Sequence, residues 1–283
     1  MAVPLSIIIL TYNEEKNITQ CLDNVLGWAQ RVIVVDSMSS DRTLEIANQM
    51  GADAYTHAFK DYADQRNWAL QNCDVKTEWV LFLDADEALS DDLKNLIEQK
   101  LPGVDSFIDG IEVKRRFYWM GRWIKYGAMY PVWLLRLART EKAHWDARSV
   151  NEHMVVEGAV ERWETDILHI DCKGVHDWIE KHNQHATLEA RELFQNIHQR
   201  KQDDFVDFNG SGAQKKRWIR QKIWNRLPIF IRPFLYFFYR YIIRLGFLDG
   251  GPGLIYHYLH AFWYRLLIDV KYVELRRKER ENL

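Results

Sequence analysis

Short apolar runs, each followed directly by a polar loop, constrain the fold of this chain most. They are residues 5–10 (LSIIIL), 31–35 (RVIVV) and 79–83 (WVLFL). Continuous runs of large and β-branched residues are typical of strands that are buried on both faces of a parallel sheet. Segments with helical spacing separate the runs, so strands and helices alternate. We therefore predict an α/β domain with a doubly wound, mostly parallel sheet.

The polar loops after these runs are expected to meet at one edge of the sheet. They are Thr11–Glu14, Asp36–Ser40 and Asp84–Asp86. In doubly wound sheets, ligands bind beyond the carboxyl ends of the strands, which places the three loops around one site. Neither a GxGxxG fingerprint nor a Walker A motif is present, so we expect the first loop to bind a nucleotide in another way.

The strongest local motif is Asp84-Ala85-Asp86 at the end of the last apolar run. Two carboxylates spaced in this way supply hard oxygen ligands for Mg²⁺ or Mn²⁺. Such a metal could neutralise a departing diphosphate. The alternative is an ordinary polar turn that leads into a helix, which Ser90 is expected to cap. Asp36 could accept hydrogen bonds from a ribose or a base, or it could cap a helix, although Asp41 is better placed to do so.

Composition is that of a globular chain with few cysteines. The 283 residues are 47% hydrophobic and 28% charged, which suits one or two domains with a sizeable core. Three scattered cysteines, Cys21, Cys73 and Cys172, form no disulfide or metal-binding pattern and fit a reducing compartment. No secretory signal is expected at the N-terminus.

Three segments follow from these patterns. Residues 1–202 are expected to form the α/β domain, with an antiparallel extension over residues 107–170. Residues 203–214, which include Asn209-Gly210-Ser211-Gly212, are expected to be a linker. Residues 215–283 are expected to form two helices that are broken at Gly250–Gly253.

The C-terminal segment is basic and rich in aromatic residues. Residues 215–283 hold 15 Lys and Arg against 5 Asp and Glu, and 15 aromatic residues lie between Trp218 and Tyr264. Charged residues interrupt the apolar stretches, so a membrane-spanning helix is not expected. The pattern favours contact with a membrane surface. The alternative is that these helices pack on the α/β domain or on another subunit. Binding to nucleic acid is disfavoured by the many large aliphatic residues.

Four motifs in this order resemble one enzyme family. They are SIIILTYNEEKNI, VIVVDSMSSDRT, DQRNWAL and WVLFLDADE, within residues 5–100. Together they resemble the family 2 glycosyltransferases, which have the GT-A fold. The resemblance implies a UDP-sugar or other nucleotide-sugar donor, a divalent metal (Mg²⁺ or Mn²⁺) and inversion at the anomeric carbon. It implies that the donor-binding residues are Thr11, Asn13, Glu14, Asp36, Arg66, Asp84 and Ala85, with Asn67 nearby. It also implies that Asp86, together with Asp84, holds the metal.

A narrower resemblance extends beyond the first hundred residues. Residues 117–138, 150–158 and 168–185 are similar to the bacterial lipopolysaccharide-core β-glucosyltransferases. That subgroup has Val-His-Glu where this chain has Val150-Asn151-Glu152, and often Asp where this chain has Val132. The resemblance makes Glu152 the candidate catalytic base, with Asp146 and Asp166 as rivals.

Four further residues are candidates because of their side-chain chemistry. His169 could complete the metal site, since imidazole binds Mn²⁺, or it could be an ordinary buried histidine. Arg122, Trp123 and Tyr130 could bind a phosphorylated saccharide acceptor, because Arg binds phosphate and aromatic rings stack on sugars. Each could equally be part of a solvated strand face over an aromatic core.

The expected function is transfer of a hexose, with glucose as the first candidate, from a UDP-sugar to a lipid-linked or lipopolysaccharide saccharide. The expected location is cytoplasmic, peripheral on the inner face of the bacterial inner membrane. One alternative is transfer to polyprenyl phosphate. The other is a non-catalytic scaffold that binds nucleotide-sugar. The sequence is also compatible with a homo-oligomer.

Overall fold

The computed structural model describes residues 2–145, 154–198 and 227–281. The chain divides into two compact units, which are described separately. The first consists of Met1–Trp123 and Met129–Lys173, and the second of Ile124–Ala128 and Gly174–Leu283. The short segment Ile124–Ala128 therefore belongs with the C-terminal residues rather than with its neighbours in sequence.

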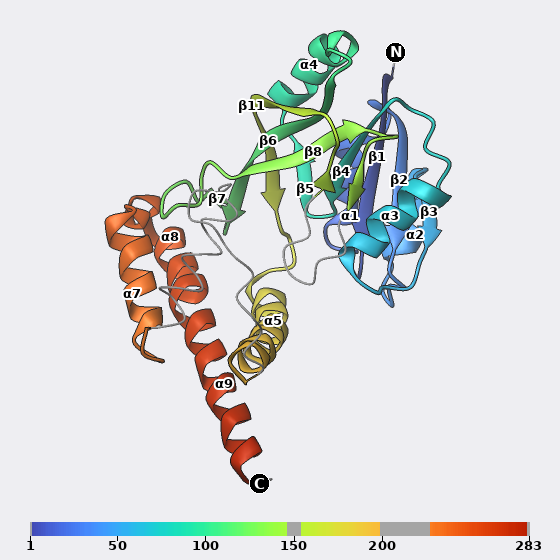
Figure 1. Ribbon diagram of the computed structural model, residues 1–283. Coiled ribbons are helices and arrows are strands. Elements are labelled where there is room, and N and C mark those ends of the chain that lie inside the picture. Colours follow the sequence, from blue (N-terminus) through green and yellow to red (C-terminus); the bar gives the residue numbers. More distant parts are fainter. Residues whose placement is uncertain (1, 146–153, 199–226, 282–283) are drawn as a thin grey trace. The chain divides into compact units, whose positions relative to one another are not determined.

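Half of the main sheet in the first unit is entirely parallel (Figure 1). Its strands, in spatial order, are β3 (Asp53–Thr56), β2 (Ala29–Asp36), β1 (Val3–Thr11) and β4 (Trp79–Asp84). Thr11 pairs with Asp36, and Leu10 pairs with Asp84. The strand ends are therefore level, and the predicted strands and the shared edge are confirmed.

The buried strands separate two apolar layers. The flanking helices are α1 (Ile18–Val25), α2 (Thr43–Met50), α3 (Tyr62–Asn72) and α4 (Asp91–Lys100). Ile7 and Ile9 pack on the side of α1, α2 and α4, whereas Ile8 packs on the side of α3. This alternation explains why the strand is apolar at successive positions. Ser90 caps α4 as predicted, since its hydroxyl accepts a hydrogen bond from Leu93 N.

The other half of the sheet is mixed. It continues from β4 through β8 (Trp133–Arg139), β6 (Ile108–Trp119), β11 (Ala159–Ile170) and β5 (Glu87–Leu89). Most of these pairs are antiparallel, as expected, but β11 runs parallel to β6. Short elements complete the unit: η1 (Leu101–Gly103), β7 (Arg122–Trp123), which pairs with β6, and β9 (His144–Trp145), which pairs with β10 (Met154–Val155).

The second unit is helical. Its elements are α5 (Val175–His198), α7 (Arg232–Phe238), η3 (Tyr239–Ile243), η4 (Gly246–Asp249), α8 (Gly250–His257), η5 (Tyr258–Trp263) and α9 (Tyr264–Glu281). Ala186 and Ala190 of α5 pack against Tyr264, Ile268 and Tyr272 of α9 in a buried cluster. The compact units therefore divide at Lys173–Gly174, before α5, whereas the sequence placed this helix in the α/β domain.

The helices are interrupted over residues 244–249, slightly earlier than the predicted break at Gly250–Gly253. The chain turns at Leu245, whose φ of 60° is left-handed, and Gly250–Gly253 form the first turn of α8. Pro252 is tolerated there because the first turn of a helix does not use its backbone N–H groups. The whole of the expected linker, residues 203–214, and residues 215–226 lie outside the described residues. Among the described helices, none is long and apolar enough to cross a bilayer.

Candidate functional site

Asp36 is the centre of a hydrogen-bonded cluster at the ends of β1 and β2. Thr11 Oγ1 donates to Asp36 Oδ2 (2.7 Å), and Ser39 donates to the same carboxylate through N (2.7 Å) and Oγ (2.6 Å). Asn13 N donates to Ser39 Oγ (2.8 Å), while Asn13 Oδ1 accepts from Ser40 N (2.9 Å). Three of the expected nucleoside-binding residues, Thr11, Asn13 and Asp36, thus lie together. Asp36 is buried, and its carboxylate accepts three hydrogen bonds.

Glu14 faces a second cluster, which the sequence did not predict. Its Oε1 accepts from Lys173 Nζ (2.6 Å), and its Oε2 accepts from Asn17 Nδ2 (2.8 Å). Asn17 also binds the segment after β11, donating to Asp171 Oδ1 (3.0 Å) and accepting from Cys172 N (2.7 Å). The loop after β1 and the loop after β11 are therefore joined by polar contacts at this edge of the sheet.

Asp84 is held between two arginines at the end of β4. Arg136 Nη2, from β8, donates to Asp84 Oδ2 (2.9 Å) and to Glu87 Oε1 (2.7 Å). Arg66 Nη2, from α3, lies 3.5 Å from Asp84 Oδ1. Glu87 is fully buried and also accepts from Asp84 N (3.1 Å). Arg136 thus fixes the carboxylate of Asp84 and compensates the buried charge of Glu87.

These contacts separate the proton affinities of the two carboxylates. Burial alone would raise the pKa of Asp84, but Arg136 and Arg66 hold that pKa well below its usual value. For Glu87, burial prevails over the attraction of Arg136, and its pKa is raised. Asp84 therefore stays ionised, and 38% of its side chain is exposed, so it can accept hydrogen bonds from a ligand.

Asp86 and His169 form the best candidate for a metal site. Asp86 Oδ1 and His169 Nδ1 lie 3.4 Å apart, and no hydrogen bond satisfies the buried Nδ1 atom. Two ligands of one octahedral Mg²⁺ or Mn²⁺ lie roughly 3 Å apart, so the pair fits such an ion with a small adjustment. Burial lowers the pKa of His169, which favours the neutral imidazole that binds metals.

A third protein ligand is not preformed. In the part of the chain that the structure describes, no three His, Cys, Asp or Glu side chains are placed to hold one ion. Asp84 points its carboxylate to the arginines instead. Asp86 and His169 would therefore hold the ion together with ligands from outside the protein, for which phosphate oxygens are suitable.

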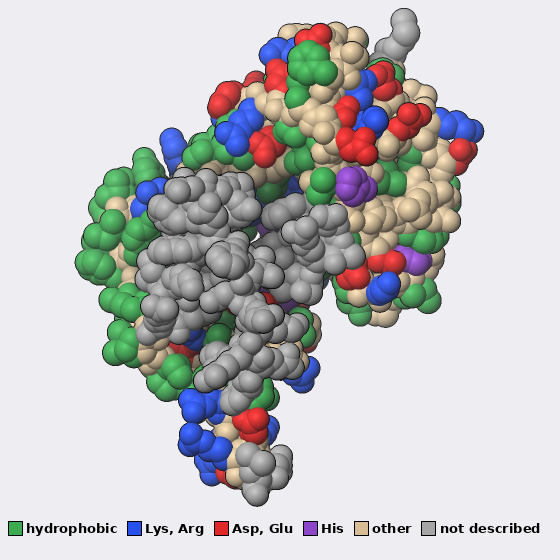
Figure 2. Space-filling view, in the orientation of Figure 1, with side chains coloured by type: hydrophobic (Ala, Val, Ile, Leu, Met, Phe, Trp, Pro, Cys, Tyr) green, Lys and Arg blue, Asp and Glu red, His purple; other side chains and the backbone are tan. Residues whose placement is uncertain are grey.

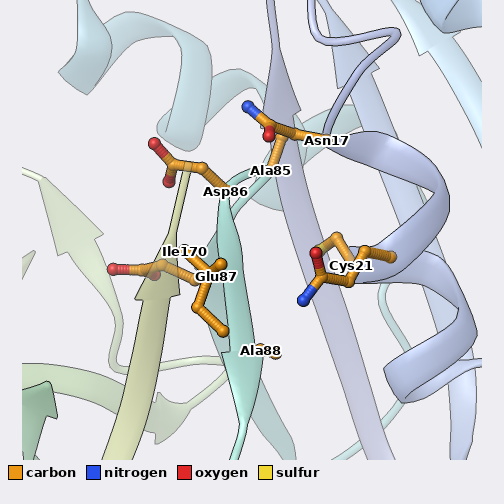
Figure 3. A pocket seen from close by; sticks show the side chains of 8 residues that line it. Asn17, Cys21, Ala85, Asp86, Glu87, Ala88 and Ile170 are labelled. Carbon is orange, nitrogen blue, oxygen red and sulfur yellow. The ribbon is translucent and has the colours of Figure 1, made fainter. Parts of the chain in front are cut away.

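A small pocket adjoins this pair. It has a volume of about 160 Å³ and lies between α1 and β5, with Asn17 and Cys21 on the helix side and Asp86 and Glu87 on the strand side (Figure 3). Its interior has essentially no room for a water molecule, so it cannot enclose a nucleotide-sugar. Ala85 also lines it and is buried.

Two polar residues of α3, Arg66 and Asn67, contact Trp145 of β9. Asn67 Nδ2 donates to Trp145 O (2.8 Å), and Asn67 Oδ1 accepts from Trp145 N (2.9 Å). The guanidinium of Arg66 lies 4.2 Å from the centre of the Trp145 ring. Asn67 thus anchors β9, and Arg66 is shared between that ring and Asp84.

The expected acceptor residues form an aromatic cluster. Trp123 and Tyr130 meet edge to face, with their ring centres 5.1 Å apart. Cations accompany both rings, because Arg116 lies 4.8 Å from the centre of Trp123 and Lys114 lies 5.6 Å from that of Tyr130. Arg122 lies opposite Trp119 in the β6–β7 pair.

The candidate base Glu152 lies outside the described residues, as does its rival Asp146. The other rival, Asp166, is buried in β11, where its Oδ2 accepts from Arg116 Nη2 (2.7 Å). Its carboxylate is engaged by the arginine and lies away from solvent, so it is not open to an incoming acceptor hydroxyl. The structure therefore disfavours Asp166.

Comparisons with known proteins identify the family. The model of the family "Glycosyl transferase family 2" matches residues 6–157, which include every residue of the described cluster except His169 and the segment after it. The chain belongs to glycosyltransferase family 2. The family resemblance is thereby confirmed, and with it the GT-A assignment and the transferase class.

Two relatives of this glycosyltransferase come from bacteria. The "Lipopolysaccharide core biosynthesis glycosyltransferase LpsC" of Rhizobium meliloti is 30% identical over 195 residues, which are 66% of this chain and 71% of that protein. An "Uncharacterized glycosyltransferase" of Rickettsia bellii is 39% identical over 94 residues, which are 33% of this chain and 31% of the relative. The second match therefore covers only about a third of that protein.

Solved structures that resemble this glycosyltransferase are distant. TarS 1–349 of S. aureus covers 100% of this chain and 92% of its own, with 16% identity and a TM-score of 0.45. Glucosyl-3-phosphoglycerate synthase of Mycobacterium tuberculosis, crystallised with Mn²⁺, UDP and glucosyl-3-phosphoglycerate, covers 40% of this chain and 44% of its own, with 20% identity and a TM-score of 0.31.

Proposed function

We propose that this family 2 glycosyltransferase moves a hexose from a UDP-sugar to a saccharide acceptor of the lipopolysaccharide core, with inversion at the anomeric carbon. The observation that carries the donor part is the convergence of Asp84, Asp86 and His169 at one sheet edge, beside the Asp36 cluster. The ionised Asp84 offers hydrogen-bond acceptance, and the Asp86–His169 pair fits a divalent ion.

The donor would be bound by its polar ends. The Asp36 cluster and Asn13 lie where a nucleoside would bind beyond β1 and β2, and Asp84 is placed for a ribose hydroxyl. Bound between Asp86 and His169, Mg²⁺ or Mn²⁺ would supply charge neutralisation for the leaving diphosphate. Glucose and uridine are supported by the resemblance of residues 117–138 and 150–158 to the core β-glucosyltransferases.

Transfer itself needs a base on the acceptor side. The acceptor hydroxyl oxygen bonds to the anomeric carbon as the bond from that carbon to the diphosphate breaks, and the hydroxyl proton passes to the base. We propose that Glu152 is the base that accepts this proton. The assignment is supported by the subgroup resemblance and by the ion pair that engages the rival Asp166.

The name of the Rhizobium meliloti relative supports a lipopolysaccharide-core acceptor. Location at the inner face of the bacterial inner membrane stays a prediction. Transfer to polyprenyl phosphate would use the same donor site, and a non-catalytic scaffold would bind the donor without turnover. The presence of Asp36, Asp84 and Asp86 together argues against a non-catalytic scaffold.

Product analysis with radiolabelled UDP-hexoses tests this proposal. The chain is incubated with each donor, Mn²⁺, and either a truncated core lipopolysaccharide or a polyprenyl phosphate. We expect label in the lipopolysaccharide, with a β-linkage by NMR when the donor is UDP-glucose. Label in an acid-labile, solvent-extracted lipid would favour the polyprenyl reaction. Donor binding without any labelled product from either acceptor would favour the scaffold.

A further inference from the structure

A continuous set of large apolar side chains is exposed on the helical unit. We call it the apolar face, and it consists of Phe230, Ile231, Phe234, Leu235, Phe238, Tyr239, Ile242, Ile243, Leu245, Phe247, Leu248, Leu254, Ile255 and Tyr258. Each is between 39% and 60% exposed. Hydrophobic side chains crowd the visible surface over α7 and α8 (Figure 2). Surfaces of this kind mark contact with a protein or a membrane.

The helical spacing concentrates these residues on one stripe. In the continuous helix formed by α7 and η3, the exposed residues Ile231, Phe234, Phe238 and Ile242 are three or four positions apart, which places them on the same side. A stripe of this kind can lie in the plane of a membrane interface, with its apolar side buried among the acyl chains.

The chemistry of the apolar face favours lipid over protein. Between residues 227 and 263, the other exposed positions are only Pro228, Arg244, Gly250 and Gly251. The exposed side chains there include no carboxylate, carboxamide, serine or threonine. Protein interfaces have a polar rim and form about one hydrogen bond per 100–200 Å². A bilayer requires no such directional partners.

Three of the charged residues that interrupt this stretch in the sequence, Arg232, Arg240 and Asp249, are buried. Arg232 Nε donates to Asp269 Oδ1 (2.8 Å), and Asp269 is fully buried. Arg240 is also buried and donates to Tyr236 Oη (3.0 Å). The charges that argue against a spanning helix therefore leave the outer side apolar, as interfacial insertion requires.

The net charge of the segment completes the argument. Residues 215–283 hold 15 Lys and Arg against 5 Asp and Glu, and the one exposed charged residue between residues 227 and 263 is the cation Arg244. Anionic headgroups attract basic segments that lie near the surface. We propose that the apolar face inserts into the interface of a bilayer that contains anionic lipids.

Docking would fix the position of one loop. Lys125 N and Tyr126 N donate to the carboxylate of Asp249 (3.2 and 2.9 Å), and Gly127 N donates to Arg244 O (2.9 Å). The loop Ile124–Ala128 therefore moves with the apolar face, and it follows the candidate acceptor residue Trp123 directly in the chain. This suits an acceptor that is itself anchored to lipid. That consequence rests on the proposed function, whereas bilayer docking does not.

Co-sedimentation of the full chain with vesicles tests the docking. We compare vesicles of phosphatidylcholine alone with vesicles that also contain phosphatidylglycerol. The wild-type chain is expected to sediment with both and more with the anionic vesicles. The double variant F234D/F238D is expected to lose roughly tenfold or more in vesicle affinity, because two apolar rings that would enter the acyl region are replaced by carboxylates. The matched control is F107D/L188D, which alters two side chains that are equally exposed elsewhere.

Folding and donor binding are measured on each variant. If F234D/F238D misfolds by circular dichroism, the single variants F234D and I243D replace it. Unchanged sedimentation of the folded variants would overturn the docking. The docking would also be overturned if the wild-type chain sedimented with neither kind of vesicle but formed a dimer that F234D dissociates. The apolar face would then bind a second copy of the chain. Titration with UDP and Mn²⁺ reports on the proposed donor site independently.

Discussion

The guanidinium of Arg136 donates to the carboxylate of Asp84 across 2.9 Å, although the two residues are 52 positions apart. The same nitrogen lies 2.7 Å from the buried Glu87. The first carboxylate of the Asp-Ala-Asp motif is thus oriented by a cation from the antiparallel half of the sheet. Burial would lower the pKa of Arg136, but these carboxylates raise it above its usual value, so the cation persists at any physiological pH.

We predict that Arg136→Met destabilises the first unit and weakens donor binding together. Removing the cation leaves Glu87 buried without its counter-charge, and breaking a buried pair costs about 3–5 kcal/mol. Denaturant unfolding measures the stability, and UDP titration measures the binding. Arg162→Met is the control, because Arg162 pairs with Glu112 at the surface, where a pair contributes about 1 kcal/mol or less. Equal losses from both variants would contradict the role of Arg136.

Substitution of the proposed base separates binding from chemistry. Glu152→Gln is expected to reduce kcat by roughly a hundredfold or more, the typical contribution of a general base, with little effect on UDP affinity. Asp166→Asn should instead act through stability, since it breaks the buried pair with Arg116. Steady-state kinetics with the labelled donor distinguishes the two. Near wild-type turnover in Glu152→Gln would reassign the base.

A buried histidine predicts the response of the second unit to acid. His257 is fully buried with no hydrogen-bond partner for either ring nitrogen, and burial together with Arg240 lowers its pKa to about 4. The unfolded chain binds a proton near pH 6.5, so stability is intact above that pH and falls as the pH drops toward 4. The loss should be on the order of 2 kcal/mol at about pH 5.

Thermal unfolding at several pH values tests this expectation. His257→Gln should flatten the decline between neutral and acidic pH, whereas His176→Gln, at an exposed position of the same unit, should leave it unchanged. An unaltered decline in His257→Gln would show that other groups cause it. His182 and His260, whose pKa values burial also lowers, would then be tested next.

Local patterns predicted the parallel half of the first unit well. The strand ends and the cap at Ser90 follow from apolar runs and from one hydroxyl, which are both local signals. The parallel pairing of β11 with β6 could not be predicted, because it depends on strands far apart in the chain. The glycines at 250–253 suggested a break, yet the turn is at Leu245, whose residue type gives no signal.

The candidate site was predicted in the same uneven way. Asp36, Asp84 and Asp86 stand directly after apolar runs, so their shared edge follows from strand order alone. No local pattern assigns a role to Arg136, Lys173 or Glu87. Their contacts with Glu14 and Asp84 join distant segments. An acidic cluster that needs compensating cations was the one signal that could have suggested them.

Calorimetric titration of UDP-, GDP-, dTDP- and CMP-sugars, with and without Mn²⁺, tests the central claim most directly. We predict that a UDP-sugar binds only with the metal, and that Asp86→Asn lowers its affinity at least tenfold while the fold is kept. If the affinity for a UDP-sugar changed neither on addition of Mn²⁺ nor in Asp86→Asn, this would contradict a metal-assisted donor site formed by Asp86 and His169.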